Sequence, residues 1–283
     1  MGSTLKQFHI DEFLLVKSAD GVSDGCIRKY KFALNYFRKW IGEDEVTSDK
    51  LLHYLGYLHK QPISDWYRKT NAQTLKTFLR YLIKAHYDFP IPEYKLPKLR
   101  RKKLCYLTQP EIKQVLKVDL STRDRLVLRL FISTGLRLSE LCELDWYDIN
   151  FSTGAIDVRH GKGDKFRVVV TDKPTLALLI RYKNKVSPED PKTPVICKSN
   201  GNRLKPMGMR SLINRLRKTS NLTFTAHALR RTFARQSYIN GMDIGWLQQL
   251  MGHESIETTR DYIQKLDTAD LVSTYQKYAP LNM

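Results

Sequence analysis

Apolar side chains recur every three or four residues along the first hundred residues, and this period constrains the fold more than any other feature of the chain. Within residues 26–41 the apolar positions are Ile27, Tyr30, Leu34, Phe37 and Ile41. Further stripes follow at Leu51, Leu52, Leu55 and Leu58, and at Leu75, Phe78, Leu79 and Leu82. One apolar stripe per segment is typical of an amphipathic helix that packs into a core. Residues 1–89 are therefore predicted to form a helical domain.

These predicted helices also have basic faces, such as Arg28 and Lys31 beside the first stripe and Arg80 beside the third. The whole chain has 48 lysines and arginines against 29 acidic residues, a net charge of +19. Such an excess opposes folding by self-repulsion and is typical of proteins with a polyanionic partner. A single basic face is usually only solvated, but three in one small domain predict a shared surface for phosphates.

Residues 90–104 have the composition of a linker. Pro90, Pro92 and Pro97 stop helices and favour extended backbone. A run of basic residues without an acid follows them, consisting of Lys98, Arg100, Arg101, Lys102 and Lys103. The run could be a nuclear-localisation signal, but a linker that lies along a DNA backbone explains both the prolines and the charge.

The second domain is predicted over residues 105–283. Thr108 and Glu111 have the spacing of a helix capping box. The β-rich segments 155–158 and 166–170 flank residues 160–165 and predict a hairpin. Helices are predicted at 123–133, 175–185, 207–218, 226–240, 244–251 and 258–266, with a C-terminal tail over 264–283. The fold class is therefore mainly α with a small antiparallel sheet in the second domain.

Several kinds of site are not expected. Cys26, Cys105, Cys142 and Cys197 form no CxxC pair or zinc-spaced cluster, which fits a reducing cytosol without disulfides. The start of the chain does not resemble a signal peptide, and no apolar run approaches the ~20 residues of a membrane span. There is no GxxxxGK[ST] loop and no dense carboxylate cluster, so neither ATP, a metal nor another cofactor is predicted.

Four short segments of the second domain concentrate polar side chains. In residues 134–141, Gly135 ends one helix and Arg137 stands before the next, three residues from Glu140. Lys162 lies between two glycines at the predicted hairpin tip. Farther along, His227 and Arg230 share one helix face, and His253 precedes Tyr262 by nine residues.

Each segment alone has an ordinary interpretation. Arg137 and Glu140 could be a surface pair that contributes only a few tenths of a kcal/mol, on the order of other i,i+3 pairs. A lysine in a turn is usually just exposed, and a lone histidine is more often a packed residue than a catalyst. A histidine and an arginine on one patch nevertheless favour phosphate binding.

Taken in order, the segments TGLRLSEL, GKGDK, HALRRTFA and LMGHESIETTRDY resemble the tyrosine recombinases, the phage-integrase and Xer family. The pattern from Ile27 to Trp40 is similar to the helical core-binding domain of that family. The resemblance extends from about Leu5 to Tyr262. Because no arm-binding domain fits before residue 5, we expect the compact Xer-like subgroup.

The resemblance implies a two-domain DNA clamp and strand cleavage without metal or ATP. Tyr262 would attack a phosphodiester to form a 3′-phosphotyrosyl bond, and a 5′-hydroxyl would later reverse the step. Arg137, Arg230 and His253 would bind the non-bridging oxygens, and Lys162 would protonate the leaving 5′-oxygen. His227 would accept or orient the tyrosine proton, and Glu140 would orient Arg137 or His227.

The implied partners are double-stranded DNA with a specific recombination site and further copies of the chain. A tetramer on DNA, with the C-terminal tail exchanged between neighbours, is expected in the cytoplasm at the nucleoid. Chromosome-dimer resolution is the expected role, and integration or excision of a mobile element or virus is the alternative. A type IB topoisomerase-like enzyme and an inactive DNA-binding protein also remain open.

Overall fold

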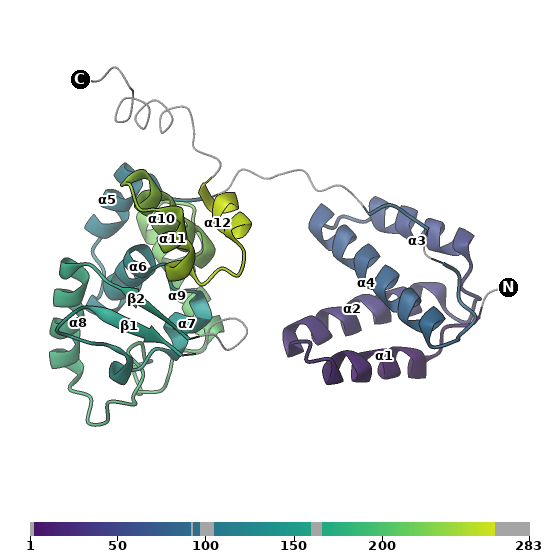
Figure 1. The fold of residues 1–283 in the computed structure, drawn as a ribbon, viewed down its shortest axis with the longest axis horizontal. Coiled ribbons are helices and arrows are strands. Elements are labelled where there is room, and N and C mark those ends of the chain that lie inside the picture. Colours follow the sequence, from purple (N-terminus) through teal and green to yellow (C-terminus); the bar gives the residue numbers. More distant parts are fainter. Residues whose placement is uncertain (1–2, 92, 97–104, 160–165, 264–283) are drawn as a thin grey trace, which may run out of the picture. The chain divides into compact units, whose positions relative to one another are not determined.

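The computed structural model of the 283-residue chain describes residues 3–91, 93–96, 105–159 and 166–263. The chain divides into two compact units, Met1–Lys102 and Lys103–Met283. Helices dominate each unit, and the second contains a two-stranded antiparallel sheet (Figure 1). The predicted fold class, mainly helical with a small sheet, is confirmed for the described residues.

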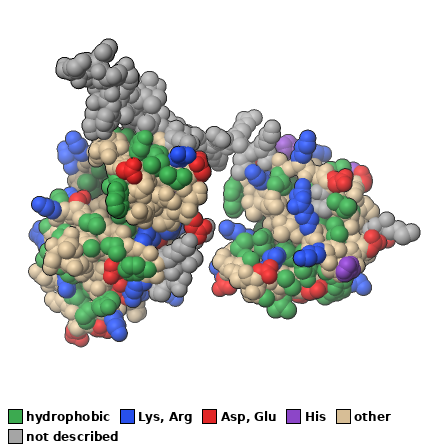
Figure 2. All heavy atoms as spheres, viewed as in Figure 1, with side chains coloured by type: hydrophobic (Ala, Val, Ile, Leu, Met, Phe, Trp, Pro, Cys, Tyr) green, Lys and Arg blue, Asp and Glu red, His purple; other side chains and the backbone are tan. Residues whose placement is uncertain are grey.

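The first unit is built around one helix. Its helices are α1 (Gln7–Ala19), α2 (Asp24–Ile41), α3 (Ser48–Lys60) and α4 (Asp65–Lys84). Helix α4 packs against the other three, and its predicted stripe, Leu75, Phe78, Leu79 and Leu82, is buried. Basic side chains predicted on the opposite faces, such as Arg28, Lys31 and Arg80, are exposed. Figure 2 shows lysine and arginine side chains on the visible face of this unit.

The predicted stripe of α3 was wrong at one position. Leu51, Tyr54 and Leu58 are the buried residues of this helix, whereas 58% of Leu52 is exposed. Residues 51, 54 and 58 follow one face of a helix, and each residue adds about 100° of rotation. Leu52 therefore lies away from the core even though its side chain is apolar.

Part of the expected linker packs onto the first unit. Tyr94 is buried, and its hydroxyl donates to the carbonyl of Ala72 on α4 at 2.8 Å. The ammonium of Lys76 donates in turn to the carbonyl of Tyr94 at 3.0 Å. Residues 97–104, which include Lys98, Arg100, Arg101, Lys102 and Lys103, lie outside the described residues.

Helix α6 forms the centre of the second unit. The helices of this unit are α5 (Gln109–Lys117), α6 (Thr122–Thr134), α7 (Leu138–Glu143), α8 (Lys173–Val186), α9 (Pro206–Ser220), α10 (Ala226–Ile239), α11 (Ile244–Met251) and α12 (Ile256–Ile263), with a short 3₁₀ turn at Trp146–Asp148. Helix α6 packs against α8, α10 and β2 (Figure 1), and its apolar residues are buried on several faces. Four residues of α6 are charged, but every residue of this helix is at least partly buried, as expected for a helix at the centre of a domain. The predicted capping box of Thr108 and Glu111 starts α5.

The two predicted strands form the hairpin stem. Strand β1 (Ala155–Val158) pairs antiparallel with β2 (Arg167–Val170), and Val158 lies opposite Arg167. Phe166, predicted as the first strand residue, lies before β2 and is 62% exposed. Residues 160–165 with Lys162, and the tail 264–283, lie outside the described residues. Among the helices described, none combines the length and the hydropathy needed to cross a membrane.

Candidate active site

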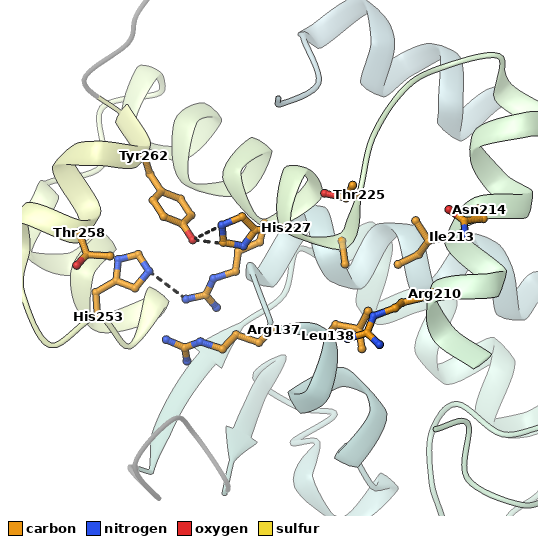
Figure 3. A pocket seen from close by; sticks show the side chains of 12 residues that line it. Arg137, Leu138, Arg210, Ile213, Asn214, Thr225, His227, His253, Thr258 and Tyr262 are labelled. Atoms are coloured by element: carbon orange, nitrogen blue, oxygen red, sulfur yellow. Dashed lines mark hydrogen bonds between the residues drawn. The ribbon is translucent and has the colours of Figure 1, made fainter. Parts of the chain in front are cut away.

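A pocket of about 620 Å³ opens in the second unit beside α7, α9, α10 and α12. Five of the six side chains for which the sequence predicted catalytic roles line it, namely Arg137, His227, Arg230, His253 and Tyr262 (Figure 3). The sixth, Lys162, lies outside the described residues. The structure thus brings together residues that are up to 125 positions apart in the chain.

The start of α10 positions two of these side chains. Thr225 caps the helix, because its hydroxyl accepts from the backbone N–H of Ala228 at 3.1 Å. His227 and Arg230 follow in the first two turns, three residues apart, so both face the pocket. An ordinary helix cap therefore fixes where the histidine and the arginine leave the backbone.

Gly135 allows α10 to approach the end of α6 closely. It ends α6 with φ +63°, and a Cβ atom at this position would lie 2.3 Å from Cδ1 of Phe233 on α10. The carbonyl of Gly135 accepts a hydrogen bond of 2.5 Å from Nη1 of Arg230. The buried guanidinium of Arg230 is thereby anchored to the same turn that precedes Arg137.

Arg137 is held by a capping box at the start of α7. The Glu140 carboxylate accepts from the Arg137 backbone N–H at 2.6 Å and from its Nη1 at 2.7 Å. Burial alone would raise the pKa of Glu140, but bonds from Arg167 and Arg137 outweigh it and lower this pKa to about 2. Glu140 is thus a buried anion that orients Arg137, and its partners in the described structure do not include His227.

Tyr262 and His227 face one another across the pocket (Figure 3). The Tyr262 hydroxyl lies 3.0 Å from Nε2 and 3.5 Å from Nδ1 of His227. Tyr262 is the penultimate residue of α12, and the guanidinium of Arg231 lies 5.5 Å from the centre of its ring. The hydroxyl is therefore directed to a hydrogen-bonding partner within a positively charged pocket.

His227 is a neutral hydrogen-bond acceptor at ordinary pH. Loss of hydration within the pocket lowers its pKa to about 4, and the charges of Arg231, Arg230 and Arg137 act in the same direction. A neutral imidazole has one ring nitrogen with a free lone pair. With Nε2 as that nitrogen, His227 can accept the proton of the Tyr262 hydroxyl.

His253 lies between a hydroxyl and a guanidinium. Its Nδ1 lies 2.9 Å from the hydroxyl of Thr259, and its Nε2 lies 3.3 Å from Nη2 of Arg230. A guanidinium only donates, so Nε2 accepts in this arrangement and Nδ1 donates to Thr259. Burial and then the charge of Arg230 lower the pKa of His253 to about 4. Since a hydroxyl can also donate, Thr259 supports the other tautomer, in which Nε2 donates into the pocket.

The net charge of the site is positive. Burial and then the charge of Arg137 lower the pKa of Arg230 to about 10, which still leaves this guanidinium charged at neutral pH. Arg137, Arg230 and Arg231 surround the Tyr262 ring or its pocket, whereas the adjacent acid, Glu140, is already paired. Such a pocket suits an anion with several oxygens. Within the part of the chain described, no three His, Cys, Asp or Glu side chains are grouped to hold a metal ion.

Sequence reasoning missed three polar residues of this region. Arg231 lies over Tyr262, Thr259 supports His253, and Arg167 bonds to Glu140. For Arg167 a signal was available, because strand alternation places residue 167 on the same side as the buried Val169. A charged side chain on the inward face of a strand requires a partner. For Thr259 no comparable pattern was visible.

Comparison with known proteins identifies the family. Residues 105–269 match the Phage integrase family. Tyrosine recombinase XerA of Pyrococcus horikoshii is 31% identical over 270 residues, which cover 95% of this chain and 92% of the relative. The chain belongs to the phage integrase family of tyrosine recombinases. It is thus a DNA strand-transferring enzyme, as its four sequence segments predicted.

Other relatives of this tyrosine recombinase extend along almost the whole chain. Tyrosine recombinase XerC of Thermodesulfovibrio yellowstonii is 30% identical over an alignment of 301 positions, gaps included, which covers 99% of this chain and 98% of the relative. A crystal structure of XerA recombinase is 25% identical, with a TM-score of 0.58 over 97% of this chain and 99% of that one. A lambda integrase tetramer bound to a Holliday junction shares the fold at 20% identity, with a TM-score of 0.76 over 93% of this chain and 78% of that one.

Proposed function

We propose that this tyrosine recombinase cuts and rejoins DNA at a specific site with Tyr262 as its nucleophile. The observation that carries the proposal is the 3.0 Å contact between the Tyr262 hydroxyl and Nε2 of His227, inside a pocket lined by Arg137, Arg230 and His253. A nucleophile beside a neutral base, surrounded by fixed cations, has the parts needed for attack on a phosphodiester.

In the proposed cleavage, the Tyr262 oxygen bonds to phosphorus while its proton moves to Nε2 of His227. The bond between phosphorus and the 5′-oxygen breaks, and the 5′-oxygen takes a proton to leave as a hydroxyl. Lys162 is the proposed donor of that proton, on the basis of its place in the sequence. The product is a 3′-phosphotyrosyl bond. Attack by a 5′-hydroxyl of another strand reverses each step, so the number of phosphoester bonds is conserved.

The negative charge on the pentacoordinate phosphorus is proposed to be met by side chains. Arg137 and Arg230 present guanidinium forks to the non-bridging oxygens, and His253 adds an N–H donor. When the oxygens replace His253 as acceptors for Arg230, Nε2 of His253 becomes free to donate. Thr259 supports this change because its hydroxyl can donate to Nδ1 as readily as accept from it.

For the biological role, we propose Xer-like resolution of chromosome dimers. The support is the similarity to XerA and XerC relatives along nearly the whole chain. Integration or excision of a mobile element is the alternative, because the fold is also that of lambda integrase and of the Tn1549 transposon integrase, with TM-scores of 0.76 and 0.77. Deletion of the gene separates these roles, since unresolved dimers would accumulate at cell division only in the first case.

The proposed assembly is a tetramer on DNA. The first unit is proposed to act as the core-binding domain, and the basic residues 98–103 to follow the DNA backbone. In the tail, Leu266, Leu271, Val272 and Tyr275 recur at near-helical spacing, and we propose that this stripe docks on a neighbouring subunit. Protein without residues 271–283 should still bind and cleave a single site but should not recombine two sites. Full recombination by that protein would show that the tail packs on its own subunit.

Tyr262→Phe tests the central proposal. The variant keeps the ring but has no hydroxyl, so it should bind DNA with unchanged affinity and form no detergent-resistant protein–DNA complex. The substrate is a site selected by binding from random DNA, nicked near the cleavage position so that the product is trapped. Tyr147→Phe, which removes a hydroxyl from an exposed ring outside the pocket, is the matched control.

Three other results would change the assignment. Covalent complex from Tyr262→Phe would mean that another residue is the nucleophile. Relaxation of supercoiled DNA without exchange between two sites would indicate a topoisomerase-like enzyme. Binding without any covalent complex from the wild-type protein would leave only a DNA-binding function.

A further inference from the structure

Three arginines from three elements converge on the end of α11. Arg167 Nε donates to the Leu250 carbonyl at 2.9 Å, Arg230 Nη2 donates to the Met251 carbonyl, and Arg137 Nη2 donates to the Gly252 carbonyl at 2.9 Å. The last carbonyls of a helix have no intrahelical partner, and the negative end of the helix dipole attracts cations. The three side chains thereby fix the turn that leads directly into His253.

Arg167 differs from the other two because it does not line the pocket. Only 9% of its side chain is exposed, and its two terminal nitrogens bind the two oxygens of Glu140 at 2.8 and 2.7 Å. Gly252 packs against it: a Cβ atom there would lie 2.9 Å from Cδ of Arg167. Because Arg167 is buried, lies outside the lining of the pocket and uses its Nε as well as both terminal nitrogens in contacts inside the protein, it is not available to a ligand in the pocket.

The two hydrogen bonds from Arg167 to Glu140 determine how strongly this carboxylate attracts the arginines of the pocket. The Glu140 side chain is 1% exposed, and its Oε2 lies 3.9 Å from Nη1 of Arg230. Without Arg167 this buried carboxylate would lack two of its donors, and a buried charge left short of partners is costly. Among the described residues Arg230 is the next cation that forms an ion pair with Glu140, so it would be drawn toward this carboxylate and away from the Gly135 carbonyl.

We propose that Arg167 is a positioning residue for strand cleavage. Arg167 supplies hydrogen-bond donors to both oxygens of Glu140 and fixes the end of α11. Arg137, Arg230 and His253 therefore remain facing the pocket. The inference rests on the proposed function, because it assigns those three side chains to the phosphate. It predicts that loss of Arg167 slows the chemical step and leaves DNA affinity nearly unchanged.

The test compares Arg167→Gln with wild type on the nicked DNA substrate. At saturating DNA, formation of the covalent complex should slow by about 100-fold, the effect of a misplacement of about 1 Å. The dissociation constant should change by less than about 3-fold, since Arg167 has no route to the DNA through the pocket. An unchanged rate at saturation, or a loss confined to affinity, would overturn the proposal.

A double-mutant cycle shows whether Arg167 acts through Glu140. If it does, Arg167→Gln should cost less than about 3-fold in a protein that already contains Glu140→Gln. Losses of equal size in the two backgrounds would contradict this route. If Arg167→Gln does not fold, Arg167→Lys replaces it in the test, because lysine keeps the charge but cannot make the bidentate contact. Arg167→Lys should cleave more slowly than wild type, and a wild-type rate would count against the proposal.

Arg203→Gln separates positioning from general stability. Arg203 also joins a backbone carbonyl, that of Cys142 at 3.0 Å, to a carboxylate, that of Asp145 at 2.6 Å, at the other end of α7. This control should lower the thermal midpoint about as much as Arg167→Gln but keep the saturated rate within about 3-fold of wild type. Equal rate losses in both variants would reduce Arg167 to a stabilising residue. The proposed function is tested separately from all of these results, by whether formation of the covalent protein–DNA complex requires Tyr262.

Discussion

At the scale of single residues, the site contains two histidines that face arginines instead of acids. Loss of hydration on burial, and then the charges of neighbouring arginines, lower the pKa of both His227 and His253 to about 4, against an ordinary value of 6.5. Both rings are therefore neutral at pH 7. Neutral His227 is able to accept the tyrosine proton, and neutral His253 can adopt either of its two tautomers. An imidazolium could do neither.

The same shifts predict how the free protein responds to acid. In the unfolded chain both histidines bind protons near pH 6.5, whereas in the folded protein they do so near pH 4. The stability contributed by the neutral histidines is therefore complete above pH 6.5 and is lost as the pH falls toward 4. Urea titrations should show a steeper fall in the free energy of unfolding over this window for wild type than for a protein with His227→Gln and His253→Gln.

His53→Gln is the matched control, because the His53 side chain is 70% exposed on α3. It should leave the pH profile of stability as in wild type. Parallel profiles for wild type and the double variant would contradict the assigned protonation states of the two pocket histidines.

At the scale of elements, Gly135 illustrates how a turn controls the site. It combines a left-handed φ of +63° with a neighbour, Phe233, that leaves no room for a Cβ atom. Gly135→Ala should lower the free energy of unfolding by about 3 kcal/mol, about 1 from backbone strain and the rest from overpacking. Cleavage should slow as well, since the Gly135 carbonyl anchors Arg230. Urea titration with hydrogen exchange of α6 and α10 peptides measures the change.

Gly201→Ala is the control for backbone strain alone. Gly201 lies in the same unit and has φ +79°, but nothing lies within 4 Å of an added Cβ atom. It should cost about 1 kcal/mol and leave the cleavage rate unchanged. If the two alanine variants were equally stable, contact with Phe233 would not be the reason for glycine at position 135.

Helices with strong local signals were predicted well from the sequence. The prediction for 244–251 matches α11, and that for α6 missed one residue at each end. No separate helix was predicted for the residues of α1. Leu52 was wrongly assigned to the core, because an apolar residue need not be buried. Burial depends on which face meets a partner, and for α3 the packing against α4 and α2 decides this.

For the site, the motifs predicted which side chains meet but not what holds them. Arg137, His227, Arg230, His253 and Tyr262 line one pocket. Strand alternation indicates that Arg167 needs a partner, but not that the partner is Glu140, which precedes it by 27 residues on another element. Thr259 is only six residues from His253, and the turn between α11 and α12 decides whether the two side chains meet.

At the scale of the whole molecule, the main feature is the excess of 48 basic over 29 acidic residues. The pocket uses only a few of these charges. Five others form the run Lys98, Arg100, Arg101, Lys102 and Lys103, which we propose to lie along the DNA backbone. Each contact of a cation with a phosphate releases counterions, so the proposal has a measurable consequence in the salt dependence of binding.

Neutralising those five residues to glutamine should weaken DNA binding and flatten the plot of log affinity against log salt. Each lost phosphate contact reduces the slope by about 0.9, so contact by most of the run predicts a reduction of about 3 to 4. Sequence preference should change little, because phosphate contacts position a protein without reading bases.

Five exposed basic residues of the second unit that do not line the pocket give a control with the same change in net charge: Lys173, Arg181, Lys185, Lys192 and Lys198. That control should change the slope by less than about 1, since a general field acts weakly beyond a Debye length of about 8 Å. Equal flattening in the two proteins would mean that only total charge matters, and an unchanged slope in the first would remove the run from the DNA contact surface.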